Sequence, residues 1–109
     1  MADSLYATKK QTVTMPLGEG TTTEINLSGH SLFAIETPNA LTGGTITFQG
    51  AASSGGTFRP IFDSANNQIS AIVGTNQFHT DIPELAPFQF IKLVMGTQAA
   101  AASFTVLMK

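Results

Sequence analysis

The chain has neither cysteine nor tryptophan among its 109 residues, and it has a single tyrosine. Without cysteine it can form no disulfide and no thiolate metal site, and redox chemistry gives no indication of its compartment. The lack of tryptophan leaves no obvious stacking platform for a carbohydrate. Charge is also scarce, since Asp, Glu, Lys and Arg make up 11% of the chain, against about 25% in an ordinary soluble domain.

The few charges exclude further classes of partner. Five basic residues against seven acidic ones give a net charge of −2. No basic stripe is available to neutralise phosphates, so we expect no nucleic-acid partner. No apolar run approaches the ~18 residues that span a bilayer. The first residues, MADSLYATKK, lack the apolar centre of a signal peptide. We therefore expect no membrane partner.

Apolar and polar residues alternate along most of the chain, which is the period of a half-buried strand. Eight segments show the pattern, separated by clusters of Gly, Pro, Asn, Asp and Ser: residues 11–15, 22–27, 31–37, 45–49, 57–62, 69–73, 88–95 and 103–109. No window of about 12 residues has a helical period. The sequence therefore predicts an all-β fold: a single antiparallel β-sandwich or jelly-roll-like domain, residues 11–109, after a polar N-terminal arm, residues 1–10.

The same alternation predicts the core and the turns. Residues 88–95 are almost continuously apolar and predict a central strand. Pro60 cannot donate to a ladder, so its strand is expected at a sheet edge or at a bulge. Gly55 and Gly56 can supply the positive φ of a hairpin turn. Residues 76–87 and 99–102 are predicted to be loops. The apolar residues of the strands are assigned to the core, and among them are Phe33, Phe48, Phe58, Phe62, Phe90 and Phe104.

Residues that could carry catalysis are few, and we expect no enzyme. His30 and His79 are the available bases, and Asp81 would share a strand face with His79, but no G-x-S-x-G elbow accompanies them. His79 is better explained as a polar side chain at a strand end or an interface. Glu24 and Glu36 could lie adjacent in neighbouring strands, yet glycosidase chemistry also needs a sugar-lined cleft.

Metal and cofactor sites are not predicted either. Asp63 and Asn66 lie in a segment that superficially resembles a calcium loop, but it lacks the spaced carboxylates and the terminal Glu. An Asx-turn is the expected role of both residues. No zinc spacing, P-loop or G-x-G-x-x-G motif is present. We expect no cofactor, no metal and no small-molecule substrate.

One long segment, ITFQGAASSGGTFRPIFDSANNQI, resembles a pattern common in small virion proteins of tailed bacteriophages. In that pattern a strand ending in F-Q is followed by a Gly-rich hairpin, an aromatic strand and a [LI]-[YF]-D turn. The later segments PFQFIKLVMGT and SFTVLMK also fit, so the resemblance covers residues 31–109. Ser53-Ser54-Gly55-Gly56 stand where such proteins often carry an acidic hairpin, which gives no support for a charged or metal-bound hairpin.

The resemblance implies a capsid decoration, or cement, protein. Such proteins are β-rich and often trimeric, and they lie on the outer face of the shell. The implied location is the virion surface, after synthesis in the host cytoplasm. The implied partners are the major capsid protein and copies of the chain itself, as a homotrimer. A carbohydrate- or receptor-binding module of a phage fibre or surface protein is the alternative.

The scarcity of charge is an independent indication that the chain binds other proteins. Exposed sheet edges are usually blunted by Lys or Pro, and Lys92 and Lys109 are the only lysines after residue 10. Partners are therefore expected to cover the edges, although a closed sandwich with Thr and Ser outside would explain the composition too.

Seven residues are the candidates for partner contacts. The arm would order on a neighbouring subunit, and a frayed terminus is the alternative. Phe78 and Phe88 flank the long loop and could be interface anchors instead of core residues. The candidates are Leu5, Tyr6, Lys9 and Lys10 in the arm, with Phe78, His79 and Phe88 around the loop.

Overall fold

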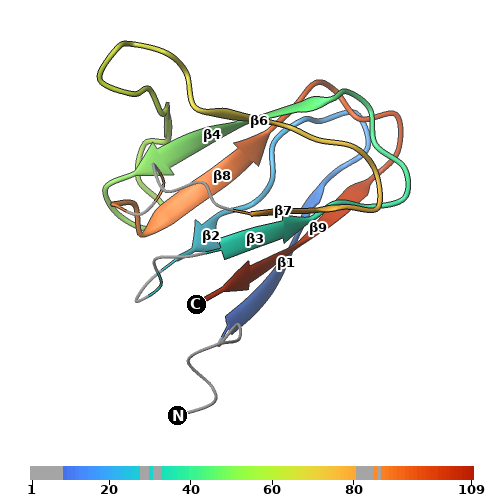
Figure 1. The fold of residues 1–109 in the computed structure, drawn as a ribbon, viewed down its shortest axis with the longest axis horizontal. Helices are drawn as coiled ribbons and strands as arrows, with labels where there is room; N and C mark the ends of the chain where they lie inside the picture. The colour runs from blue at the N-terminus through green and yellow to red at the C-terminus, as the bar shows by residue number, and fades with distance from the viewer. Residues whose placement is uncertain (1–8, 28–29, 31–32, 81–84, 86) are drawn as a thin grey trace.

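The computed structural model describes residues 9–27, 30, 33–80, 85 and 87–109, and it is all-β within them (Figure 1). Two antiparallel sheets face each other as a sandwich, and no α-helix occurs in these ranges. The predicted fold class is confirmed. The strands are β1 (Lys9–Met15), β2 (Ile25–Asn26), β3 (Phe33–Glu36), β4 (Thr45–Ala51), β5 (Arg59–Pro60), β6 (Ser70–Ile72), β7 (Phe78–Thr80), β8 (Phe90–Val94) and β9 (Ala102–Met108).

The first and last strands pair along their whole length. One sheet has the order β1-β9-β3-β7, and the other has the order β2-β8-β4-β5, with β6 also paired to β4. β8 therefore lies between β2 and β4, as its apolar run predicts, and β5 with Pro60 lies at an edge. The register of β1 on β9 runs from Lys9 opposite Met108 to Met15 opposite Ala102.

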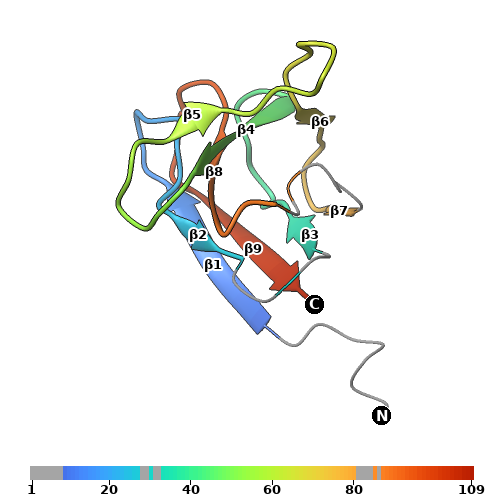
Figure 2. The ribbon, with the colours of Figure 1, turned by 90° about the vertical axis from the view of Figure 1, so that its left-hand side faces the viewer.

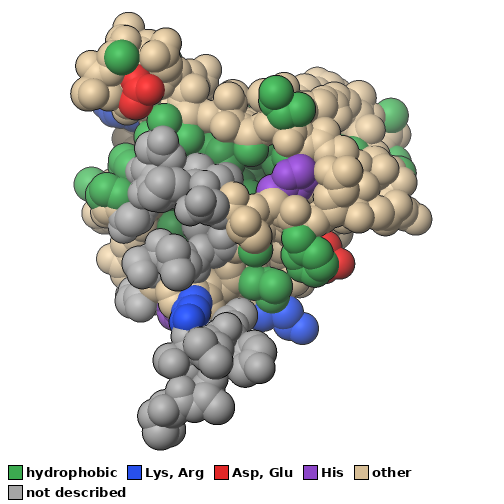
Figure 3. All heavy atoms as spheres, viewed as in Figure 1, with side chains coloured by type: hydrophobic (Ala, Val, Ile, Leu, Met, Phe, Trp, Pro, Cys, Tyr) green, Lys and Arg blue, Asp and Glu red, His purple; other side chains and the backbone are tan. Residues whose placement is uncertain are grey.

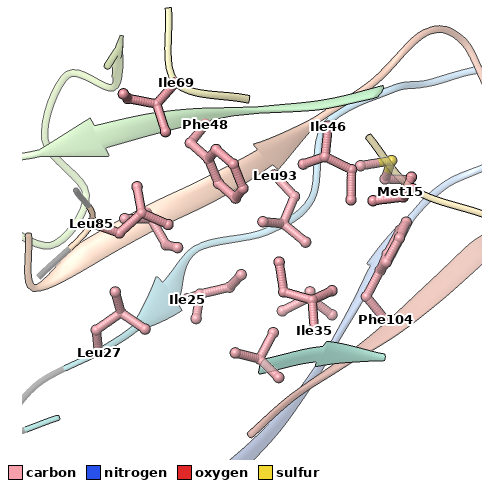
Figure 4. Close-up of a cluster of buried hydrophobic side chains, with 14 of the residues drawn as sticks. Met15, Ile25, Leu27, Ile35, Ile46, Phe48, Ile69, Leu85, Leu93 and Phe104 are labelled. Carbon is pink, nitrogen blue, oxygen red and sulfur yellow. The ribbon is translucent and has the colours of Figure 1, made fainter. Parts of the chain in front are cut away.

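The core fills the space between the sheets (Figure 4). Along β4, Ile46 and Phe48 are fully buried and Thr45 is exposed, because successive strand side chains point to opposite faces. Phe104 and Ile35 meet them from the other sheet, and Leu85 is also fully buried in the cluster. The strand period therefore predicted most of the core correctly.

Phe58 and Phe62 are exceptions, and their assignment to the core is wrong. The Phe62 side chain is 48% exposed, while neighbouring Ile61 is buried. Phe58 is not part of the core cluster, and its ring lies 4.5 Å from Lys92 Nζ on the outer face of the sheet. The cause is the register of β5 on β4, which places Pro60 opposite Gln49. Phe48 faces inward, so its neighbour Gln49 faces outward, and Pro60, which lies opposite Gln49, faces outward too. Residues 58 and 62, two positions from Pro60, share that outward face. The alternation of residues 57–62 was correct, but its phase was off by one.

Several boundaries also differ from the predictions. β1 begins at Lys9, so Lys9 and Lys10 are strand residues and not arm residues. β7 lies within residues 76–87, which were predicted to be loop. The hairpin between β4 and β5 has Gly55 at φ 68°, whereas Gly56 is not among the residues with positive φ.

A glutamine side chain closes one side of the sandwich, where β1 of one sheet passes β2 of the other. Gln11 Nε2 donates to the Glu24 carbonyl at 3.0 Å, and the Asn26 amide donates to Gln11 Oε1 at 3.2 Å. Lys9 Nζ adds a bond of 2.6 Å to the Asn26 carbonyl. The Gln11 amide thus takes the place of a neighbouring peptide group along β2.

A second glutamine ties the loops together at the far end of the strands. Gln98 is 1% exposed. Its Oε1 accepts from the Thr42 amide at 2.9 Å, and its Nε2 donates to the carbonyls of Thr42 and Gly96 at 2.9 and 2.8 Å. Its backbone bonds to Gly18 and Glu19. Residue 98 therefore joins three loops, two through its side chain and one through its backbone.

Removing that side chain tests its role. We expect Gln98→Ala to lower the free energy of unfolding by about 3 kcal/mol, because it removes a buried side-chain amide together with its three hydrogen bonds to the backbone of Thr42 and Gly96. The exposed Gln68 is the matched control, and Gln68→Ala should change the value by less than about 0.5 kcal/mol. Urea unfolding of both variants measures the difference. Equal values for the two variants would contradict this role.

Candidate binding site

The hairpin formed by residues 52–58 is fixed to the outer face of the five-stranded sheet. The Glu24 carboxylate accepts from Ser54 Oγ at 2.8 Å and from the Gly55 amide at 2.9 Å. Lys92 Nζ lies 4.5 Å from the centroid of the Phe58 ring, a cation–π contact. Figure 2 shows the hairpin extending beside β2, where Glu24 lies just before the strand. Two contacts therefore hold a glycine-rich hairpin in place.

A groove of about 530 Å³ opens beside this hairpin, within the size range of ligand sites. Its apolar wall includes Phe88, whose ring lies so close to Gly50 that a Cβ there would stand 2.5 Å from Phe88 Cδ1. Glycine at position 50 is therefore needed for this packing. The groove is lined by Gly50, Ala51, Ala52, Thr57, Arg59, Pro60, Ile61, Pro87, Phe88 and Gln89.

Among the described residues that line the groove, Arg59 alone carries a formal charge. The side chain belongs to the edge strand β5, is exposed, and forms no ion pair with any of the described residues. Phe88 and Pro60 supply apolar surface beside it. A guanidinium next to apolar walls favours a ligand with a carboxylate and an apolar side chain. The groove offers one aromatic ring, which is only part of the platform that the carbohydrate alternative requires.

The structure separates the predicted partner residues into different places. Phe88 lines the groove, but Phe78 and His79 belong to β7 at the edge of the other sheet. Phe78 is 58% exposed and points outward. Lys9 Nζ is bonded within the fold. Leu5 and Tyr6 lie outside the described residues.

His79 faces the core. It lies opposite the fully buried Ile35 on β3, and its Nε2 is buried without a hydrogen-bond partner among the residues that the structure describes. The proposed acid partner Asp81 lies outside the described residues. The His30 amide donates to the Leu27 carbonyl. Glu24 and Glu36 lie at different sheets, so the prediction that they could be adjacent is wrong.

Asp63 forms the predicted Asx-turn. Its Oδ1 accepts from the amides of Ala65 and Asn67, each at 2.9 Å, and Asn66 has φ 65°. Within the described ranges, no three His, Cys, Asp or Glu side chains cluster as metal ligands would. The same residues contain no helix long and apolar enough to cross a membrane.

Comparison with known proteins adds a likeness in fold. No family model and no curated protein sequence matches the chain. Among solved structures, it is similar to the SPBc2 prophage-derived protein YomS, with a TM-score of 0.55 and 10% sequence identity over 93% of this chain and 94% of that one. The two proteins therefore share a fold over nearly their full lengths.

Sequence reasoning missed two residues of this region. Arg59 and Glu24 were not singled out as parts of a binding surface, although Arg59 lies within the aromatic segment TFRPIF. That segment carried a usable indication, a lone cation between phenylalanines. The sequence around Glu24 gave no such indication, because its partners Ser54 and Gly55 are about thirty positions away.

The Glu24 contact predicts a pH-dependent hairpin. Hydrogen bonds from Gly55 and then Ser54 lower the pKa of Glu24 below its ordinary value of 4.5. A lowered folded-state pKa means that the contact is fully present above about pH 4.5 and is lost as the pH falls through the folded-state pKa. We expect the Gly55 amide resonance to titrate below about pH 4.5 in NMR spectra, where carboxylates protonate.

Two variants complete that test. Glu24→Gln should remove the titration of the Gly55 amide and broaden the hairpin resonances at neutral pH. Glu36→Gln changes an exposed carboxylate on the other sheet and should leave both unchanged. A Gly55 titration that survives in Glu24→Gln would show that another group is responsible.

The unpaired ring nitrogen of His79 gives a second prediction. A buried polar atom without a partner costs about 1–3 kcal/mol. We therefore expect His79→Leu to leave the melting temperature unchanged or raise it. His79→Gln keeps a polar group at the same position and should melt lower than His79→Leu. If His79→Leu melts lower than both the parent and His79→Gln, the imidazole makes a stabilising contact, and this explanation is wrong.

Proposed function

We propose that this protein is a structural virion protein of a tailed phage, which binds the outer surface of the assembled capsid and stabilises it as a decoration protein. Two observations support the proposal. The strand-and-turn pattern of residues 31–109 resembles that of small phage virion proteins. A prophage-derived protein shares the fold over nearly the whole chain.

The exposed apolar side chains are the observation that supports the proposal most strongly. Among the residues that the structure describes, four large apolar side chains are exposed, one on each sheet and two between strands: Ile72 at 84%, Phe78 at 58%, Leu17 at 67% and Phe62 at 48%. On the face drawn in Figure 3, charged side chains are few and dispersed among uncharged polar atoms. Such a surface loses little charge solvation when a protein covers it, which is typical of the centre of an interface.

Stabilisation would follow from selective binding. A protein that binds the assembled lattice and not its loose subunits shifts the equilibrium toward the lattice, by about 2.7 kcal/mol per site at one hundred times the Kd. Several linked copies would strengthen a weak contact further. This function needs no catalytic step and no cofactor.

Co-sedimentation with purified capsids, from the phage whose genome encodes the chain, tests the proposal. We expect the parent protein to pellet with capsids and to remain in solution without them. Phe78→Thr removes an exposed aromatic ring from β7 and keeps a strand-forming residue there. It should weaken binding about tenfold if Phe78 is an interface anchor.

Phe78→Tyr is the matched control, because it keeps an aromatic ring at the same exposed position of β7. It should bind like the parent. A parent protein that stays in the supernatant at every concentration would rule out capsid binding. Equal binding of parent and Phe78→Thr would exclude Phe78 from the interface and leave the function standing.

A further inference from the structure

The groove beside the hairpin lies at the same end of the sandwich as Lys9, the first residue of β1. Lys9 is bonded through Nζ to the Asn26 carbonyl. Asn26 lies opposite Phe90, and Phe90 lies opposite Ala51, which lines the groove. The first residue of β1 is therefore only a few strand widths from the groove, and eight further residues precede it in the sequence.

Those eight residues, MADSLYAT, have the chemistry that the groove favours. Asp3 supplies a carboxylate, and Leu5 supplies an apolar side chain two positions later. In an extended segment, residues two positions apart share a face and lie about 7 Å apart. The groove presents the matching pair, the ring of Phe88 and the exposed guanidinium of Arg59, which forms no ion pair with the described part of the chain. Fully extended, eight residues span about 27 Å, enough to reach an adjoining copy.

We propose that residues 1–8 of one copy occupy the groove of a second copy, with the Asp3 carboxylate at Arg59 and Leu5 against Phe88. The contact is head-to-tail, because the arm and the groove are different surfaces of the same chain. Repeated contacts of this kind close into a ring when the rotation permits. The inference goes beyond capsid binding and does not depend on it.

The absence of cysteine allows a direct test, since any introduced thiol is unique. Full-length Ser4→Cys chains are mixed with full-length Ala52→Cys chains under mild oxidation, without capsids. Ser4 lies between Asp3 and Leu5, and Ala52 is an exposed residue of the groove. We expect a covalent dimer of the two different chains, because a bound arm holds the thiols at about millimolar effective concentration.

Thr97→Cys is the control for chance encounters. Thr97 is also exposed, but it follows the far end of β8, away from the groove. Its cross-linking with Ser4→Cys should be about tenfold slower, since no effective concentration assists it. Equal rates for Ala52→Cys and Thr97→Cys would overturn the proposal.

A charge swap identifies the contact itself. Arg59→Asp in the groove chain should slow the cross-link to Ala52→Cys about two- to fivefold, the range for an exposed ion pair. Asp3→Arg in the arm chain should restore the rate. A cross-linking rate that neither Arg59→Asp nor Asp3→Arg alters would contradict the Asp3–Arg59 pairing. A Ser4→Cys/Ala52→Cys double variant that cross-links only within one chain, at any dilution, would assign the arm to its own groove and overturn exchange between copies.

Discussion

At the sides and ends of this sandwich, uncharged side chains form the hydrogen bonds that a neighbouring strand would otherwise supply to the backbone. The rest of the structure depends on these bonds. The Gln11 amide bonds the backbone of β2 as a neighbouring strand would, and the Gln98 amide does the same for Thr42. Thr37 Oγ1 similarly donates to the Gly74 carbonyl and accepts from the Gln77 amide. Because buried peptide groups must be paired, these bonds allow two short sheets to close with few charged residues.

These side-chain bonds also determine which parts of the surface remain accessible. Gln11 and Lys9 already cover β2, whereas β7 with exposed Phe78 and the groove between Phe88 and Arg59 are accessible among the described residues. They lie on different sheets, so one copy can contact two neighbours at once. Two separate surfaces of this kind suit the proposed assembly, in which each copy would bind both a second copy and the capsid.

Strand periodicity was enough to predict the fold class, the central position of β8 and the edge position of Pro60 from the sequence. It was not enough for positions that depend on the partner strand. Phe62 points outward because β5 pairs with β4 in a register that no local pattern specifies. Phe88 was singled out as a candidate partner residue and lines the groove, but the groove also needs Arg59 and the hairpin held by Glu24, contacts between residues far apart in sequence. The strand at β7 was missed because three residues, FHT, are too few to show a period.

The central claim is that this charge-poor unit is completed by neighbours of its own kind. Native mass spectrometry of the full-length protein over a range of concentrations tests it most directly. The account predicts a closed oligomer, a trimer by resemblance to decoration proteins, that dissociates on dilution. A monomer at every concentration would contradict it and would favour the simpler explanation of a sandwich whose threonine- and serine-rich exterior faces only water.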